Sequence, residues 1–141
     1  MIVPFSFMYR YSGSEPEEPS RPVIPVELSY AGESIAIWAL VDSGADISVF
    51  HPQVAEALGI SFQDAPVMQL ERFGADAAQA SLIEVYVRIG EVRVAATIGF
   101  SEHVPYAEGL LGRHRVFDQI RFGFLQAGEM LLYTPEIGAV Q

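Results

Sequence analysis

One carboxylate in this sequence is placed where an acid can take part in chemistry. Asp42 follows the apolar run Ala39 to Val41 and precedes Ser43, Gly44 and the largely apolar run Ile47 to Phe50. An acid between two apolar strands is partly buried, and burying a carboxylate is costly unless it is paired, hydrogen-bonded or protonated. The placement favours a functional role for this acid, although Asp-Ser-Gly alone is also a common turn sequence.

Hairpins with glycine turns are expected to position this acid. Each turn lies between two runs rich in apolar residues, and Leu82 to Ile89 alternates with period two, as a half-buried strand requires. Three hairpins are predicted, with strands 23–30 and 34–41 around Ala31-Gly32-Glu33, strands 82–89 and 92–98 around Gly90-Glu91, and strands 120–125 and 130–133 around Gly128-Glu129. The second strand of the first hairpin leads directly into Asp42.

Helix signals are few. Pro52 suits a first helical position and Gly59 a helix end, so a short helix is predicted over Pro52 to Leu58, and a second over Arg113 to Gln119. Ala77 to Ala80 also reads locally as helical. Many short strands with two short helices predict an all-β domain, closed or folded over on itself. The length of 141 residues predicts a single domain, with a polar, proline-rich surface loop at about 12–22.

Composition excludes several classes of partner. The net charge of -10 and only eight Lys and Arg residues disfavour nucleic acid and anionic membranes. No cysteine is present, which excludes disulfides and thiolate ligands. No run approaches a membrane span, and Met1 to Tyr9 lacks the features of a secretory signal and reads as a strand. We therefore expect a cytoplasmic protein.

The twelve residues from Ala39 to Phe50 resemble the active-site signature of retropepsin-like aspartic peptidases: three apolar residues, then Asp-Ser-Gly-Ala, then an apolar tail. Gly109 to Arg113, Gly-Leu-Leu-Gly-Arg, resembles the second hallmark of the family, which precedes its short C-terminal helix. The resemblance covers most of the chain from about Val23 to Phe124. It implies a closed acid-protease-type β-barrel.

The resemblance also implies a mechanism. Two facing carboxylates share a proton, so that one activates a water molecule while the other donates to the scissile carbonyl. This chain has one such motif, so the second Asp42 would come from another copy across a two-fold axis. The implied function is that of a homodimeric endopeptidase that acts on peptides or unfolded proteins, needs no cofactor and has a mildly acidic optimum.

Neighbours of Asp42 acquire roles by the same comparison. Ser43, in the active-site loop with Ala45, would hydrogen-bond across the dimer axis, while Gly44 would let the backbone approach substrate closely. Asp46 would either receive substrate amides or pair with Arg113, which would brace the loop; the alternative is an exposed surface ion pair of little energetic value.

The flap that closes over substrate in this family is expected between Val67 and Leu82, with its tip at Phe73, Gly74 and Ala75. The alternative is a plain connecting loop, because the segment is poor in glycine. In retropepsin dimers the terminal strands interleave. Met1 to Phe7 and Met130 to Tyr133 would thus form interface strands, or else pack within the monomer.

Other residues favour structural roles. His51, His103 and His114 lack the short spacings of zinc sites, so no metal is expected, and His51 is suited to starting a helix. Trp38 is expected in the core. Two functions compete with the peptidase: a catalytically silent retropepsin-like module for dimerisation or peptide binding, and an unrelated β-barrel with a chance Asp-Ser-Gly turn.

Overall fold

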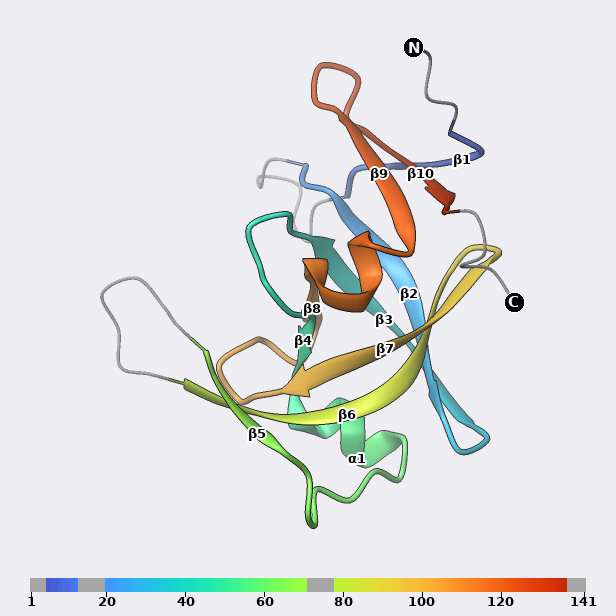
Figure 1. Ribbon diagram of the computed structural model, residues 1–141. Coiled ribbons are helices and arrows are strands. Elements are labelled where there is room, and N and C mark those ends of the chain that lie inside the picture. The colour runs from blue at the N-terminus through green and yellow to red at the C-terminus, as the bar shows by residue number, and fades with distance from the viewer. Residues whose placement is uncertain (1–4, 13–19, 71–77, 137–141) are drawn as a thin grey trace.

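The computed structural model describes residues 5–12, 20–70 and 78–136, most of which lie in or between strands (Figure 1). The elements are β1 (Phe7–Arg10), β2 (Val23–Tyr30), β3 (Glu33–Val41), β4 (Val49–Phe50), α1 (Pro52–Ala57), β5 (Val67–Leu70), β6 (Ala78–Ile89), β7 (Val92–Phe100), β8 (Glu108–Leu111), η1 (Arg113–Phe117), β9 (Ile120–Leu125) and β10 (Met130–Pro135). The predicted all-β class is confirmed.

Six strands close into a barrel. They pair in the order β2-β3-β8-β4-β7-β6, and the last part of β6 returns to pair with β2, while β5 lies outside the ring and pairs with the first part of β6. Closure removes the unpaired edges that an open sheet leaves to solvent. The barrel predicted from the resemblance is therefore present, and β8 lies between β3 and β4.

The three predicted hairpins are confirmed. Their turns contain residues in the left-handed region, with φ of 88° at Gly32, 58° at Gly90 and 53° at Glu129. Glycine takes this conformation without the steric cost that other residues meet. The second hairpin is longer than predicted, because the stretch over residues 78–80 that reads as helical is strand, paired with β5. Tertiary pairing overrides the helix propensity of alanine there.

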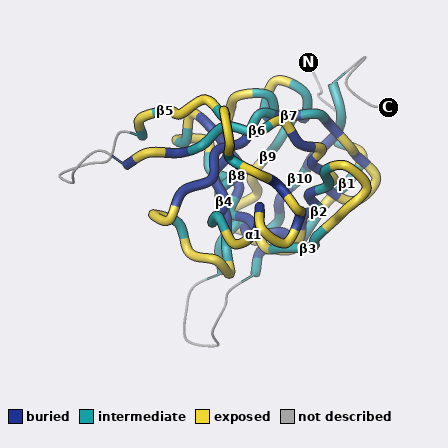
Figure 2. Tube along the Cα trace, turned by 90° about the horizontal axis from the view of Figure 1, so that it is seen from below, coloured by how far each residue is buried: buried dark blue, intermediate teal, exposed yellow. Residues whose placement is uncertain are grey.

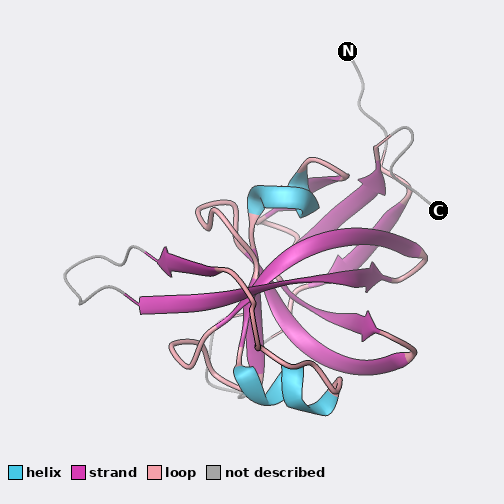
Figure 3. Cartoon of the chain, turned by 60° about the horizontal axis from the view of Figure 1, so that its bottom comes forward, coloured by secondary structure: helices cyan, strands magenta, loops and turns pink. Residues whose placement is uncertain are grey.

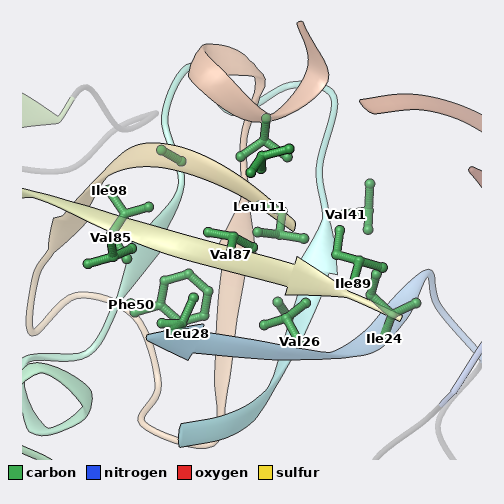
Figure 4. Packing of buried hydrophobic residues seen from close by; sticks show 14 of the residues in the cluster. Ile24, Val26, Leu28, Val41, Phe50, Val85, Val87, Ile89, Ile98 and Leu111 are labelled. Carbon is green, nitrogen blue, oxygen red and sulfur yellow. The ribbon is translucent and has the colours of Figure 1, made fainter. Parts of the chain in front are cut away.

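Alternation along the strands sends one set of apolar side chains into the barrel. Ile24, Val26 and Leu28 on β2 meet Val85 and Val87 on β6 there (Figure 4). Figure 2 shows buried stretches along the strands and exposed ones at the turns. Burial of each such side chain stabilises the fold by about 1.5–3 kcal/mol.

The prediction that Trp38 belongs to the core is wrong. Trp38 is 48% exposed, whereas Ala39 beside it is fully buried. Successive side chains in a strand point to opposite faces, so the alternation that turns Ala39 inward turns Trp38 outward. Its partners on the outer face are Pro25 on β2 and Glu108 on β8.

The terminal strands form a separate three-stranded sheet in the order β1-β10-β9. Phe7 of β1 pairs with Tyr133 of β10, and both neighbours of β10 come from its own chain. Residues 7–10 and 130–135 thus pair within one chain, whereas Met1 to Pro4 of the predicted terminal run lie outside the described residues. The interleaving of terminal strands with a partner stays a prediction. Among the described strands, β1 and β9 form the outer edges of this sheet.

The two helical segments lie on opposite sides of the strands (Figure 3). The first prediction is confirmed by α1, where the side chain of His51 accepts a hydrogen bond from the Gln53 N–H at 3.1 Å. The second is only partly correct, because η1 is a single kinked turn in which Arg115 has a φ of 62°. Within the described ranges, no helix is long and apolar enough to cross a membrane.

Candidate active site

Asp42 is held by backbone amides at the end of β3. Its own N–H donates to the Leu111 carbonyl at 2.9 Å, and its carboxylate Oδ1 accepts from the Gly44 N–H at 2.9 Å. The Asp42 carbonyl accepts from the Ala45 N–H at 3.2 Å, which closes the turn. Ser43 and Gly44 are exposed, and Asp42 is half-buried. The carboxylate is therefore fixed in direction and still reachable.

The second hallmark, Gly109 to Arg113, lies directly against the active-site loop, which runs from Asp42 to Ser48 between β3 and β4. After Leu111, the Arg113 N–H donates to the Ala45 carbonyl and the His114 N–H donates to the Asp46 carbonyl, both at 2.9 Å. These bonds draw the start of η1 towards the loop. The two hallmarks, predicted separately from sequence, form one continuous structure.

Gly112 is the point of closest approach. A Cβ atom there would lie 2.4 Å from the Ile47 carbonyl oxygen, well inside contact distance. Its N–H donates to the Ser48 Oγ at 3.0 Å in a fully buried position. Sequence analysis assigned no role to Ser48, although Ser48 lies within the signature run, because its contact spans 64 residues.

Asp46 and Arg113 form an ion pair, as one of the two expectations for Asp46 requires. Their side chains are 77% and 56% exposed, so the pair contributes little to stability. It links the loop to η1 from the solvent side. This geometry leaves the other Asp46 oxygen available to a ligand.

A groove of about 490 Å³ opens beside the loop. Its lining is mostly apolar and comes from the loop, β4, β5, β8 and the turn after β7: Gly44, Ala45, Asp46, Ile47, Val49, Met68, Gln69, Leu70, His103, Val104 and Leu110. Asp42 does not line it directly, but Gly44 and Ala45 do. The contributions of His103 and Val104 had no signal in the sequence.

The groove borders the hairpin in which the flap was expected. β5 and β6 pair antiparallel from Val67 with Ser81 to Leu70 with Ala78, so they form the arms of a hairpin. The predicted tip residues Phe73, Gly74 and Ala75 lie outside the described residues.

The histidines are dispersed. His51 caps α1, His103 lines the groove and the backbone of His114 contacts the loop. Within residues 5–12, 20–70 and 78–136, no group of three or more His, Asp or Glu side chains is placed to hold a metal ion.

The family model for aspartyl proteases matches residues 25–114, which contain both hallmarks and the barrel strands between them. The chain belongs to the aspartyl protease family. Membership in this family excludes the alternative of an unrelated β-barrel with a chance Asp-Ser-Gly turn. No curated protein sequence matches the chain.

Solved structures of the family share the fold. The chain is similar to the retroviral protease-like domain of Ddi1 from Leishmania major, with 17% identity and a TM-score of 0.59 over 87% of this chain and 94% of that one. It is also similar to a retropepsin-like aspartic protease from Rickettsia conorii, with 15% identity and a TM-score of 0.59 over 94% and 96% of the two chains. At these identities the likeness shows the retropepsin-like fold alone.

Proposed function

We propose that the protein is an aspartic endopeptidase that works as a symmetric homodimer, with one Asp42 carboxylate from each copy. The observation that carries this proposal is the setting of Asp42, on an anchored loop beside an apolar groove. The single motif in the chain supports a dimer, because the chemistry of the family requires two carboxylates.

Two Asp42 carboxylates in contact cannot both ionise, so one keeps a proton. The ionised group takes a proton from a water molecule whose oxygen attacks the scissile carbonyl carbon. The protonated group donates its proton to the carbonyl oxygen. Collapse of the resulting diol, with proton transfer to the amide nitrogen, breaks the C–N bond and releases a carboxylic acid and an amine.

The surrounding residues support peptide binding. The groove presents Ile47, Val49 and Leu110, which suit an apolar side chain of the substrate. Asp46 would accept a backbone N–H of the peptide with the oxygen that is turned away from Arg113. Ser43, exposed at the tip of the turn, would bond across the dimer axis.

Asp42→Asn tests the proposal with an unstructured protein such as casein as substrate. We expect cleavage to fall by at least about 10²-fold, because a neutral amide cannot take the proton of the water. Asp64→Asn is the matched control, since Asp64 is exposed in the loop before β5 and its φ of 63° suits asparagine equally well. Cleavage that survives in the Asp42 variant would contradict the proposal.

A folded wild-type protein that binds peptide without cutting it, with affinity indifferent to Asp42→Asn, would favour the silent peptide-binding module. Binding of a statine-type transition-state mimic separates these outcomes independently of turnover. We expect its affinity to drop sharply in Asp42→Asn and to be unchanged in Asp64→Asn.

A further inference from the structure

We propose that Ser48 is a positioning residue for Asp42, acting through the Gly112 amide. The inference rests on the proposed peptidase function and adds a residue to which the first hallmark gave no role. Ser48 is fully buried, and its Oγ lies 3.0 Å from the backbone nitrogen of Gly112. This hydrogen bond joins the end of the active-site loop to the residue after β8, the strand whose Leu111 carbonyl accepts from the Asp42 N–H.

The loop is attached to the segment Leu111 to His114 at four consecutive residues. Three of these attachments are backbone hydrogen bonds, made by Asp42, Ala45 and Asp46, so no side-chain substitution removes them. The fourth joins the Gly112 N–H to the Ser48 hydroxyl and depends on a side chain. The Asp46–Arg113 ion pair also links the loop to this segment through side chains, but it is exposed, whereas the Ser48 hydroxyl is fully buried.

Gly112 packs directly against the backbone of the loop. A Cβ at Gly112 would meet the oxygen, carbon and nitrogen of Ile47 at 2.4, 2.5 and 2.8 Å, so the two backbones are in direct contact. A buried N–H that loses its acceptor is costly, and a shift of the loop is the available way to relieve it.

A second bond ties the same residue to the barrel. The Ser48 carbonyl accepts from the Gly99 N–H of β7 at 2.8 Å. Ser48 thus holds β7 through its backbone and the segment after β8 through its side chain. Loss of the hydroxyl would keep the hydrogen bond to Gly99 and remove the hydrogen bond to Gly112. The backbone would therefore move on the Leu111–Gly112 side, where the Leu111 carbonyl accepts from the Asp42 N–H.

Ser48→Ala is the test, with Ser48→Thr as the variant that retains the hydroxyl. We expect Ser48→Ala to lower kcat about 10- to 100-fold with KM changed by less than about threefold, because small displacements of reacting groups cost this much. We expect Ser48→Thr to recover most of the activity. Val87→Ala controls for lost stability, since Val87 is fully buried on β6 and its register partners are Leu28 and Val94.

Amide hydrogen exchange followed by NMR gives a readout that does not need catalysis. We expect the exchange rate of the Gly112 amide, relative to that of Val85 in the barrel, to rise in Ser48→Ala and to stay unchanged in Val87→Ala. If Ser48→Ala does not fold, Ser48→Cys carries the same measurements, because its sulfur is a weak acceptor.

Wild-type kcat in Ser48→Ala, or an equal loss in Val87→Ala, would overturn the role of Ser48. So would an unchanged exchange ratio. A wild-type protein that cleaves nothing would refute the proposed peptidase instead, and the exchange ratio would still decide whether Ser48 fixes the loop.

Discussion

At the scale of single residues, backbone contact between the two hallmarks explains the glycine at position 112. Gly112 has an extended backbone with φ of -102°, which any residue can adopt, so its requirement is space and not conformation. The Ile47 backbone occupies the volume into which a side chain would point. The second hallmark therefore contains a glycine because two chain segments touch there.

Gly112→Ala should accordingly lower the free energy of unfolding by at least about 2 kcal/mol, because the methyl group forces the backbones apart. Urea unfolding measures this change. Gly128→Ala is the control, since Gly128 is exposed and the nearest atom to an added Cβ is 3.9 Å away. We expect the control to change stability by less than about 0.5 kcal/mol. Equal effects of the two substitutions would show that the close contact at Gly112 does not exist.

Prediction from sequence succeeded where a residue carries its own signal. Gly32 and Gly90 in the turns and Pro52 at the start of α1 each have local chemistry that the fold uses directly. The contact of Ser48 with Gly112 has no such signal, because a serine in a strand-like run looks the same whether or not a distant amide faces it.

At the scale of elements, the position of β8 was the feature that sequence patterns did not predict. β8 runs parallel to β3 and antiparallel to β4, between two strands that are adjacent in sequence. The sequence of a short apolar strand does not specify which strand it pairs with.

Wrong assignments in other elements have the same origin. Trp38 was placed inside because its neighbours are apolar, but β3 is buried on one face only. The helix expected from Arg113 is interrupted at His114 and Arg115, whose backbones leave the right-handed helical region. Apolar neighbours in sequence indicate neither the buried face of a strand nor such an interruption.

Packing of β10 on the second hairpin leads to a pH prediction. Burial raises the pKa of Tyr133 well above its usual range, and Tyr9 and Glu91 raise it further. In the unfolded chain the phenol ionises near pH 10, so the stability that Tyr133 provides is complete below about pH 10 and is lost as pH rises above it.

Tyr133→Phe removes this titration. Between about pH 9 and about pH 11, we expect the unfolding free energy of the variant to fall less steeply than that of the wild type, as measured in urea. Tyr106→Phe serves as the control because Tyr106 is 47% exposed. Parallel slopes for the wild type and Tyr133→Phe would contradict the burial of this phenol in solution.

At the scale of the whole molecule, the proposed catalysis requires two chains, because each chain has a single Asp-Ser-Gly motif. The terminal sheet is complete within one chain, and Met8 and Leu125, both more than half exposed, lie on its strands. Under the proposed function, activity belongs to the dimer and not to the single chain.

Mixing subunits tests this dependence. A tenfold excess of Asp42→Asn, added to wild-type protein at saturating substrate, should reduce cleavage to about one-tenth after subunits exchange, because mixed dimers have a single carboxylate. The rate before exchange is the internal reference. An unchanged rate after subunits have exchanged, verified by native mass spectrometry, would show that one chain suffices.

Two Asp42 carboxylates facing each other across a two-fold axis are the feature on which the proposed activity depends. The most direct measurement is a crystal structure of the protein bound to a statine-type inhibitor. We expect a symmetric dimer in which oxygens of the two carboxylates lie about 2.5–3.0 Å apart, within hydrogen-bonding reach. A monomer, or a dimer that keeps the two Asp42 side chains beyond the reach of a shared proton, would contradict the proposal.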